Sequence, residues 1–256
     1  MTPSSDDVTR TLGVKKSSVA SVSARGRAPE TCFGSESLPE HLPARGLFVS
    51  IEGIEGAGKS TLAEALAARV SDAGREVVLT HEPGGTAVGD SIRKLLLESG
   101  EGVSDRAELL LFEAARAQHV DFVIAPAIER GAVVICDRFA DSSTAYQGGA
   151  RRIDADTVAR LNEFATRGIK PDLTILLDLP ASVGLARQRL TDRISAQGLA
   201  FHESVRQAYL AVARAEPERV VVIDARQAVG AVIEQAWEAM TGRGGSLLVI
   251  RHGQDA

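Results

Sequence analysis

Residues 47–61 read LFVSIEGIEGAGKST, a short apolar run followed by a glycine-rich loop and the start of a helical pattern. From residue 53 to residue 60 the stretch fits G-x-x-x-x-G-K-[ST] at every fixed position. Residues 62–70 are strong helix formers with apolar side chains at helical spacing. Strand, loop and helix in this order predict a phosphate-binding loop (P-loop) rather than a chance glycine turn.

The residue types of this loop suit a nucleoside triphosphate. Its glycines allow backbone conformations that bring amides close to phosphate oxygens, and the dipole of the following helix adds to the attraction. Lys59 is a point charge suited to the β- and γ-phosphates, and the hydroxyl of Ser60 suits Mg²⁺. The residues predicted to bind the triphosphate are Gly53, Ile54, Glu55, Gly56, Ala57, Gly58, Lys59, Ser60 and Thr61.

Composition narrows the possible classes of protein. The 256 residues are 25% charged and 44% hydrophobic, values that fit one α/β domain with tails. A net charge of −5 and an aromatic content of 4% argue against nucleic acid as the main partner. Cys32 and Cys136 are too few for a disulfide framework, and no apolar run approaches membrane-spanning length. We therefore expect a reducing, cytoplasmic location.

The chain divides into three parts by composition. Residues 1–45 are rich in Ser, Thr, Pro, Gly and Arg and predict a disordered extension, with a transit peptide or an overcalled start site as alternatives. Residues 46–241 form the predicted P-loop domain, and residues 242–256 form a tail. In the tail, Arg251, His252 and Gly253 resemble the opening motif of histidine phosphatases. Only three residues follow this motif, so we expect no phosphatase activity.

Strand and helix signals alternate along the central domain, which predicts a parallel sheet with helices on both faces. The expected strands are residues 47–51, 75–80, 132–136, 173–179 and 219–224. The main expected helices are residues 60–71, 105–129, 201–213 and 227–240, the second of them interrupted near Pro126. A further helix is expected to carry Arg187, Arg189 and Arg193.

Several features favour a kinase among P-loop proteins. The chain has no Asn-Lys-x-Asp motif of the kind that reads guanine in switch GTPases. The third strand ends in Asp137 and Arg138, where motors and transporters usually have Asp-Glu, and an arginine there suits an anionic acceptor. Phe112 and Arg116 are four residues apart on one helix and can stack a base and hold a phosphate. Arg93 lies on the helix after the Gly-Gly loop.

Four further motifs carry a resemblance to a known family. They are EPGGT at 82–86, ELLLFEAARAQH at 108–119, DRF at 137–139 and SSTAYQG at 142–148. Together with the P-loop they resemble bacterial thymidylate kinases, over about residues 47–240. The resemblance implies a three-layer P-loop NTPase fold with a five-stranded parallel sheet and a short helical lid. It also implies transfer of the γ-phosphoryl group of ATP to dTMP with Mg²⁺, and a homodimer.

The resemblance implies a role for each matching position. Arg93, Arg116 and Arg138 would hold the acceptor phosphate, Phe112 would stack on thymine, and Thr144 and Gln147 would read the base edge. Glu55 matches an acidic position near the acceptor sugar, and Ser60 and Asp137 would serve Mg²⁺. In the family, a mobile arginine near the γ-phosphate comes either from the P-loop or from the lid. The P-loop of this chain has no arginine, so the lid would supply that residue. The implied catalytic residues are therefore Lys59, Arg138, Asp137, Glu55, Arg189 and Arg193.

Two positions depart from the family pattern. His81 stands where the bacterial family usually has Arg, which weakens one expected charge near the acceptor. Phe139 stands where the family has Tyr or His, which removes a polar group but keeps the Asp137–Arg138 pair. Two alternatives stay open at this point: a P-loop kinase for another nucleoside monophosphate, and an inactive nucleotide-binding module.

Overall fold

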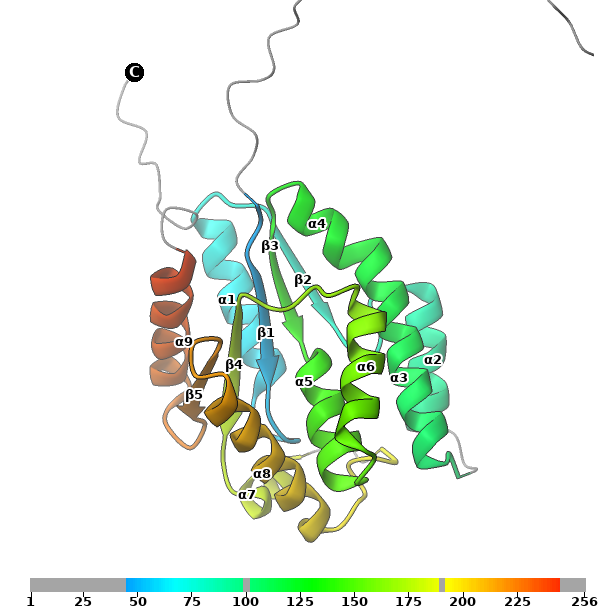
Figure 1. Ribbon diagram of the computed structural model, residues 1–256. Helices are drawn as coiled ribbons and strands as arrows, with labels where there is room; N and C mark the ends of the chain where they lie inside the picture. Colours follow the sequence, from blue (N-terminus) through cyan, green and yellow to red (C-terminus); the bar gives the residue numbers. More distant parts are fainter. Residues whose placement is uncertain (1–44, 99–101, 189–191, 245–256) are drawn as a thin grey trace, which may run out of the picture. The chain divides into compact units, whose positions relative to one another are not determined.

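The computed structural model describes residues 45–98, 102–188 and 192–244 (Figure 1). Nearly all of the predicted extension, residues 1–45, falls outside the described residues, and so do Arg189 and the Arg-His-Gly motif at 251–253. The predictions made for these parts of the chain therefore remain predictions.

A five-stranded parallel sheet forms the centre of the fold, in the strand order β2-β3-β1-β4-β5. The strands are β1 Phe48–Glu52, β2 Val77–His81, β3 Val133–Asp137, β4 Leu173–Asp178 and β5 Val220–Asp224. The predicted α/β class and the five parallel strands are confirmed, with boundaries shifted by one or two residues. Because β1 is central, the P-loop that follows it opens between the ends of β3 and β4.

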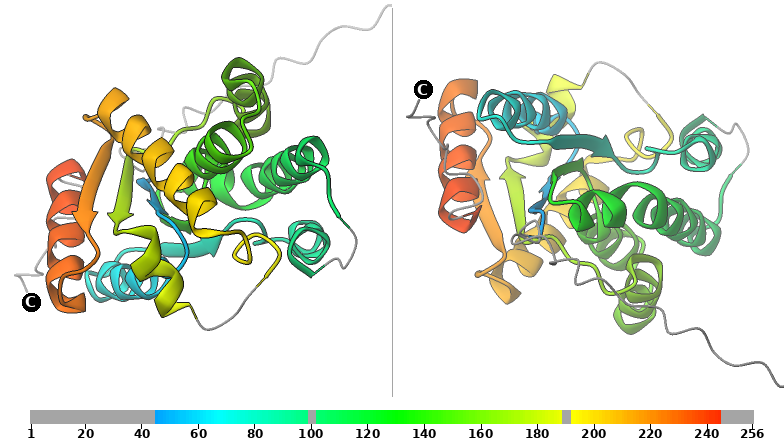
Figure 2. Two further views of the ribbon diagram at one scale, coloured as in Figure 1. Left: turned by 90° about the horizontal axis from the view of Figure 1, so that it is seen from below. Right: turned by 90° about the horizontal axis from the view of Figure 1, so that it is seen from above.

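Helices cover both faces of the sheet. The helical elements are α1 Lys59–Asp72, α2 Ala87–Glu98, α3 Asp105–His119, η1 Val120–Ile124, α4 Ala125–Glu129, α5 Ala140–Ser143, η2 Thr144–Ala150, α6 Ala155–Thr166, α7 Ala181–Arg187, α8 Leu199–Ala215 and α9 Val229–Gly244. Helices α1 and α9 pack on one face, and α4 and α8 pack on the other (Figure 2). Helices α2, α3 and α6 continue the second side beyond the edge of the sheet. The result is the three-layer arrangement expected from the sequence.

The side chains of β1 show why the sheet is buried on both sides. Val49 and Ile51 belong to the apolar core that includes Leu62 and Leu66 of α1. Phe48 points to the other face, where its ring meets the ring of Phe139 edge-on at 4.9 Å. A strand buried on both faces must be apolar at nearly every position, which is why residues 47–51 form a continuous apolar run with a single serine.

One helix is interrupted as predicted, and another is shorter than predicted. The pattern over residues 105–129 forms α3 and α4 joined by the π-helical turn η1, directly before Pro126, whose missing N–H disrupts the regular ladder. The helix expected to carry Arg187, Arg189 and Arg193 is shorter than predicted, because α7 ends at Arg187 and Arg193 lies in a turn, while Arg189 lies outside the described residues. The carboxylate of Asp192 accepts the backbone amides of residues 194 and 195, which favours a turn over a continuing helix.

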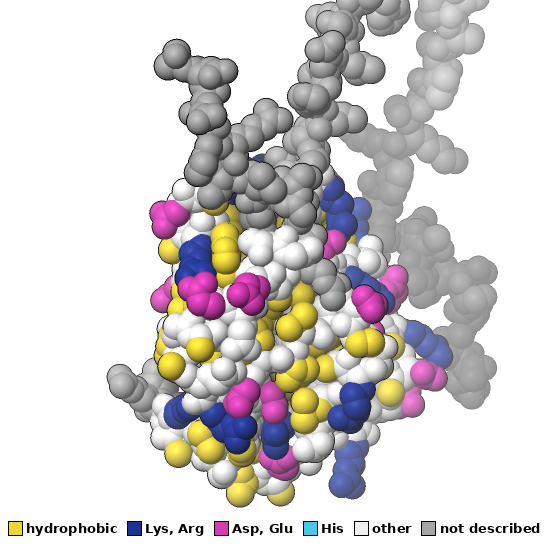
Figure 3. Space-filling model, turned by 90° about the vertical axis from the view of Figure 1, so that its left-hand side faces the viewer, with side chains coloured by type: hydrophobic (Ala, Val, Ile, Leu, Met, Phe, Trp, Pro, Cys, Tyr) yellow, Lys and Arg dark blue, Asp and Glu magenta, His cyan; other side chains and the backbone are white. Residues whose placement is uncertain are grey.

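The face that carries α9 mixes charges of both signs (Figure 3). Arg69 of α1 pairs with Glu234 of α9 and lies 5.7 Å from the ring centroid of Trp237. No helix among the described residues is long and apolar enough to cross a membrane.

The P-loop lies directly against the backbone of α7. Gly56 has a φ of 71°, and a Cβ built there would lie 2.0 Å from the carbonyl oxygen of Gly184. The approach is mutual, since a Cβ on Gly184 would lie 2.4 Å from the carbonyl oxygen of Glu55. Backbone atoms cannot move aside as a flexible side chain can, so both positions require glycine. The turn of the P-loop is therefore set partly by α7, a helix more than 120 residues later in the chain.

We predict that Gly184→Ala displaces the P-loop. The added methyl group would force the loop off α7, so the KM for the triphosphate should rise at least about tenfold, as misplacement of a binding loop generally does. Gly230→Ala is the matched control, because it lies in α9 with open space around the new Cβ and should leave the KM unchanged. Steady-state kinetics give the KM for the triphosphate of both variants, and thermal unfolding gives their stability. Equal KM values for Gly184→Ala and the wild type would contradict it.

Candidate active site

A cleft of about 680 Å³ opens at the carboxyl ends of the central strands. Its size suits a small-molecule ligand. Open α/β sheets generally bind their ligands outside the carboxyl ends of the strands, which is where this cleft lies. Of the residues predicted from the sequence, those that line the cleft are Glu55, Gly56, Lys59, Ser60, Arg93, Phe112, Asp137, Arg138 and Gln147. The structure therefore brings the triphosphate loop and most of the expected acceptor residues to one cavity.

The P-loop places a cation and a hydroxyl at the floor of this cleft. The Nζ of Lys59 donates to the carbonyl of Ile54 at 2.8 Å, and burial together with the charge of Arg138 lowers the pKa of Lys59 to about 8. The Oγ of Ser60 donates to Oδ2 of Asp137 at 2.6 Å, which joins the start of α1 to the end of β3. Gly58 precedes α1 with a φ of 94°. The other predicted loop residues, among them Gly53, Ile54, Ala57 and Thr61, do not line the cleft with their side chains.

Glu55 is held in place by three other elements. Its Oε1 accepts the hydroxyl of Tyr146 at 2.6 Å and the guanidinium of Arg138 at 3.1 Å, and its Oε2 lies 2.9 Å from Nδ1 of His202. Burial opposes ionisation of Glu55, but His202, Arg138 and Lys59 outweigh it and hold the pKa of the carboxyl well below its usual range. Glu55 is therefore an anion held by Tyr146 and Arg138, with the His202 ring of α8 close to its other oxygen.

Arg138 has an unusual backbone conformation. Its φ of 74° lies in the left-handed region, which costs a non-glycine residue free energy and occurs often at functional sites. Its amide donates to the carbonyl of Ile51, and its guanidinium donates to the carbonyl of Gly53 at 3.0 Å and to Glu55. These contacts hold the guanidinium beside the P-loop while it lines the cleft.

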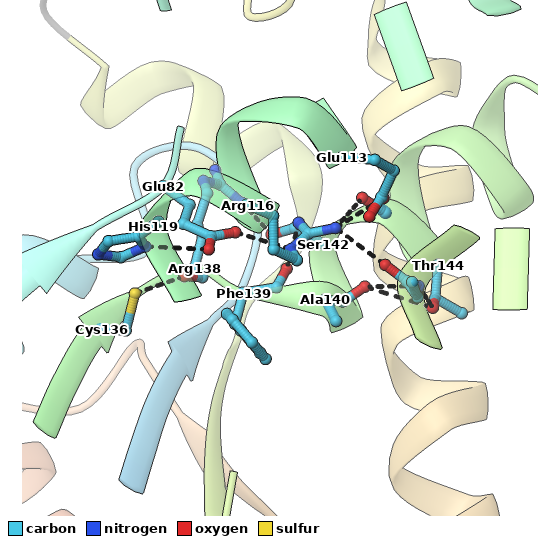
Figure 4. Close-up of polar contacts among 12 residues, drawn as sticks. Glu82, Glu113, Arg116, His119, Cys136, Arg138, Phe139, Ala140, Ser142 and Thr144 are labelled. Atoms are coloured by element: carbon cyan, nitrogen blue, oxygen red, sulfur yellow. Dashed lines mark hydrogen bonds and ion pairs between the residues drawn. The ribbon is translucent and has the colours of Figure 1, made fainter. Parts of the chain in front are cut away.

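Arg116 does not line the cleft, contrary to the role in phosphate binding that was expected for it. Its side chain is 1% exposed and is surrounded by polar groups of several segments (Figure 4). The guanidinium donates to Glu82 at 2.8 Å, Glu113 at 2.6 Å and the hydroxyl of Ser143 at 2.9 Å. It also donates to the side chain of Asn162 and the carbonyl of Phe139. Arg116 therefore connects these segments, and its expected contact with the acceptor phosphate stays a prediction.

The residues of the segment 142–147 that line the cleft differ in part from those expected. Thr144 is exposed and bonds to the carbonyl of Ala140, whereas Ser142, Ser143, Tyr146 and Gln147 line the cleft. No role for Ser142 or Ser143 was predicted, although both lie in the motif 142–148. The π-helical turn η2, which the sequence pattern does not reveal, rotates the side chains relative to an α-helix.

Arg193 also lies away from the P-loop. Its Nε donates to the carbonyl of Leu96 at 2.8 Å, and its other nitrogen pairs with Glu108 at 2.6 Å. It does not line the cleft, whereas its neighbours Asp192 and Ile194 do. Arg187 donates to the carbonyl of Ala225 and also points elsewhere. Of the three arginines considered for the lid, the two that the structure describes thus have protein partners outside the cleft.

Arg93 and His81 line the cleft next to the EPGGT loop. Arg93 donates to the carbonyl of Pro83 at 2.9 Å, which leaves nitrogen donors for a ligand. Burial and the neighbouring charge of Arg93 lower the pKa of His81, so its ring is neutral at pH 7. The replacement of Arg by His at this position therefore removes a positive charge from the cleft.

Glu52 is a buried carboxyl directly before the P-loop. It accepts the amide of Phe139 and the hydroxyls of Ser142 and Tyr209 at 2.7 to 2.8 Å. Burial, together with the nearby charge of Asp141, raises its pKa to about 7. Sequence reasoning missed this residue, since a glutamate at the end of an apolar strand gives no signal of its surroundings.

Comparison with known proteins places the chain among thymidylate kinases. A sequence model of the thymidylate kinase family matches residues 51–236. The thymidylate kinase of Pseudomonas putida (strain GB-1) is 51% identical over 191 residues, which cover 73% of this chain and 91% of the relative. That of Geobacter sulfurreducens is 47% identical over 208 residues, covering 77% and 98%. The crystal structure of thymidylate kinase from Ehrlichia chaffeensis matches with a TM-score of 0.66 at 31% sequence identity, covering 77% of this chain and 99% of that chain.

We predict that the charge of Glu52 makes stability depend on pH. Its pKa is about 7 in the folded protein against 4.5 ordinarily. Its contribution to the free energy of unfolding is therefore complete below pH 4.5 and is lost as the pH rises through 7. Relative to Glu52→Gln, whose side chain stays neutral, the unfolding free energy of the wild type should fall by roughly 2–3 kcal/mol between pH 5 and pH 8. Urea unfolding at each pH measures the difference, and parallel profiles for the two proteins would count against it.

Proposed function

The chain belongs to the thymidylate kinase family and transfers the γ-phosphoryl group of ATP to dTMP, giving dTDP, and we propose that this transfer takes place in the cleft described above. One observation carries the proposal. Lys59 and Ser60 of the P-loop, which suit the donor, line the same cavity as Arg93 and Arg138, which suit an anionic acceptor. A cleft with both ends built for phosphate fits a phosphoryl transfer between two nucleotides better than hydrolysis.

The donor end is assigned to the P-loop. Backbone amides of residues 53–61 and the N-terminus of α1 would hold the ATP phosphates, and Lys59 would contact the β- and γ-phosphates. Lys59 already bonds to the carbonyl of Ile54, so the loop holds its charge in place before ATP binds. With a pKa of about 8, Lys59 is mostly protonated at pH 7. The negative phosphates would favour the protonated form further.

The residues present fit a Mg²⁺ ion, although the described residues contain no cluster of three or more His, Cys, Asp or Glu side chains suited to a metal. Mg²⁺ in kinases is bound through one or two protein oxygens together with the substrate phosphates. The hydroxyl of Ser60 and the carboxylate of Asp137 provide such oxygens 2.6 Å apart beside the P-loop. We assign the ion to these two residues, and when bound it would neutralise charge on the transferred phosphoryl group.

The acceptor end is assigned to residues of α2, α3, α5 and η2 and of the turn that follows β3. Arg93 and Arg138 would hold the phosphate of dTMP, and the ring of Phe112 would stack on thymine. Gln147 would contact the base edge, and Ser143 takes the place expected for Thr144 because Ser143 lines the cleft. Glu55 fixes Arg138 and, as the family resemblance implies, lies near the acceptor sugar. Arg116 supports this end of the cleft through Ser143.

Positioning and charge neutralisation are sufficient for this reaction. Phosphoryl transfer passes through a loose transition state, so the attacking phosphate oxygen of dTMP needs no strong base. Arg138, held by Gly53 and Glu55 of the P-loop, would orient that oxygen toward the γ-phosphate. Arg189 stays our candidate for the mobile arginine at the γ-phosphate. Arg193 would have to leave Glu108 to take that part.

We predict that Arg93→Met weakens binding of dTMP selectively. The loss of a charge-assisted hydrogen bond costs about 1.5–3 kcal/mol, so the KM for dTMP should rise roughly 10- to 100-fold while the KM for ATP stays constant. Arg160→Met, an exposed position on α6, is the control and should match the wild type. A coupled ADP-release assay with dTMP, dUMP, UMP, CMP, AMP, GMP and thymidine measures both constants. A change confined to the KM for ATP would move Arg93 to the donor end.

We predict that Asp137→Asn changes the dependence on Mg²⁺. The Mg²⁺ concentration for half-maximal activity should rise about 10- to 100-fold, as for other residues that orient metal ligands. The exposed Asp156→Asn provides the matched control. The same assay, run at fixed ATP and dTMP over a series of Mg²⁺ concentrations, gives the midpoint. An unchanged midpoint in Asp137→Asn would remove this residue from the metal site.

We also propose that the enzyme is a cytoplasmic homodimer, as the family resemblance implies. Leu110, Phe122 and Phe164 are 56%, 69% and 82% exposed on α3, η1 and α6, elements that lie along one side of the fold. Large apolar side chains on neighbouring helices are typical of a protein interface. The molar mass measured by sedimentation tests the dimer. Fractionation of expressing cells tests the cytoplasmic location.

A further inference from the structure

The hydroxyl of Tyr209 contacts three polar groups beside the P-loop. Tyr209 lies on α8, is 2% exposed and does not line the cleft. Its oxygen is 2.8 Å from Oε2 of Glu52, 2.8 Å from Oγ of Ser142 and 3.2 Å from Nη1 of Arg138. These partners belong to the end of β1, to α5 and to the turn after β3. A buried phenol outside the cleft thus joins three segments that form it.

The chemistry of the partners determines the direction of these hydrogen bonds. Burial raises the pKa of Tyr209 well above its usual value, so the phenol keeps its proton. The guanidinium of Arg138 only donates, so the phenol oxygen must accept from it. The phenol proton is then directed away from Arg138, toward Oε2 of Glu52. The lone pair that faces Arg138 is therefore held in place by the bond on the other side of the hydroxyl.

The contacts of Arg138 determine which of its nitrogens are left for a ligand. Nη1 donates to Tyr209 and to the carbonyl of Gly53, and Nη2 donates to Glu55. No described residue accepts a hydrogen bond from Nε. The N–H of Nε and one N–H of Nη2 are left, and neighbouring guanidinium N–H groups bind two phosphate oxygens together. Because Arg138 lines the cleft, these groups are the ones available to an acceptor phosphate.

Glu52 connects the backbone of this turn to the phenol. The φ of Arg138 is 74°, which costs free energy, so the surrounding contacts must hold the turn. The Oε1 of Glu52 accepts the amide of Phe139, directly after Arg138, at 2.7 Å. Its Oε2 accepts the phenol of Tyr209. One buried carboxyl therefore fixes both the backbone that carries Arg138 and the hydroxyl that contacts its guanidinium.

Helix α8 holds Tyr209 in place. His202, Arg206 and Tyr209 stand at positions i, i+4 and i+7 and share one face of the helix. Arg206 donates to both carboxylate oxygens of Asp178, at the end of β4, at 2.7 and 3.0 Å. The buried ring of His202 lies 2.9 Å from Oε2 of Glu55. This face of α8 is therefore attached to β4 and packed against the P-loop within two turns of the phenol.

We propose that Tyr209 is a positioning residue that acts through Arg138: its hydroxyl holds Nη1, so that Nε and Nη2 face the phosphate of the acceptor nucleotide. This role rests on the proposed function, in which Arg138 holds the phosphate of dTMP. The phenol itself touches no part of the nucleotide. Its loss therefore weakens the contribution of the phosphate to binding and leaves the contribution of the nucleoside unchanged.

The test is Tyr209→Phe in the full chain, which removes the hydroxyl and keeps the ring against that of Tyr146. Calorimetry gives the Kd of dTMP, of ATP and of thymidine, which lacks the phosphate. The Kd of dTMP should rise about tenfold, because a misdirected guanidinium loses a charge-assisted hydrogen bond. The Kd of thymidine and that of ATP should stay within about twofold of the wild type. Equal weakening of dTMP and thymidine, or no weakening of either, would overturn the proposal.

A double-mutant cycle shows whether Tyr209 acts through Arg138. In Arg138→Met the group that the phenol positions is gone, so adding Tyr209→Phe should change the Kd of dTMP by less than about twofold. A further rise of about tenfold in the double variant would contradict the proposed route through Arg138.

The single variant Arg138→Met separates this role from the proposed function. It should weaken dTMP and leave thymidine unchanged. If it weakens neither, or both equally, the placement of the acceptor phosphate is wrong and the role of Tyr209 falls with it. A selective loss of dTMP in Arg138→Met but not in Tyr209→Phe would overturn the role of Tyr209 alone.

Thr174→Val is the matched control for the loss of a buried hydroxyl. Thr174 is 1% exposed, donates to the carboxylate of Asp141 at 3.0 Å and does not line the cleft. Thermal unfolding gives the stability lost in Thr174→Val and in Tyr209→Phe. The Kd of dTMP in Thr174→Val should stay within about twofold of the wild type. A selective loss of dTMP as large as in Tyr209→Phe would show that the loss of any such hydroxyl has this effect, against the proposal.

If Tyr209→Phe does not fold, Glu52→Gln/Tyr209→Phe takes its place. An amide at 52 accepts from the amide of Phe139 and donates to Ser142, so no buried charge is left short of donors. Glu52→Gln alone is the reference, because Tyr209 still accepts from Arg138 there. The double variant should bind dTMP about tenfold more weakly than this reference and thymidine equally well. Equal Kd values of dTMP in the two variants would overturn the proposal.

Discussion

The parallel pairing of β1 with β3 is the constraint on which the site depends. Ile51 pairs with Asp137 in the register of these strands, so the P-loop and the Asp137–Arg138 turn leave the sheet at one edge. Ser60 and Asp137 are 77 residues apart in sequence and 2.6 Å apart in space for this reason. A shift of register by one residue would reverse the direction of every side chain on the strand. The donor and acceptor ends of the cleft are therefore consequences of strand pairing.

Buried charges in this protein are arranged around the cleft in hydrogen-bonded groups. Glu55 with Arg138, Glu82 with Arg116 and Glu108 with Arg193 each join segments far apart in the chain. A buried ion pair adds little net stability, but removal of one partner leaves an unpaired charge and costs about 3–5 kcal/mol. Such groups suit a site that must hold few, well-directed polar contacts in place before the substrates arrive.

The same groups explain where sequence reasoning succeeded and where it did not. The P-loop, Asp137 and Arg138 were found because their function depends on residue type and local spacing. Arg116 was expected at the acceptor phosphate, but it is enclosed by Glu113 of its own helix and by Glu82 and Ser143 from two other segments. Thr144 was expected at the base edge from the family resemblance, but across the π-helical turn η2, which local spacing does not reveal, it is exposed while Ser143 lines the cleft. Arg193 was placed on a helix that ends at Arg187, and it lies instead in a turn that Asp192 stabilises.

The sequence by itself determined the fold class and the phosphate-binding loop, because apolar periodicity and glycine spacing act within about a dozen residues of chain, and its further motifs carried the resemblance to the family. Only the tertiary structure decided which arginines reach the cleft, which serine faces it and which carboxyls are charged. Those properties depend on burial and on partners more than 25 residues away, as Arg116 with Ser143 and Glu108 with Gln147 show. A side chain's direction and charge are set by the groups that surround it, and local spacing does not specify those groups.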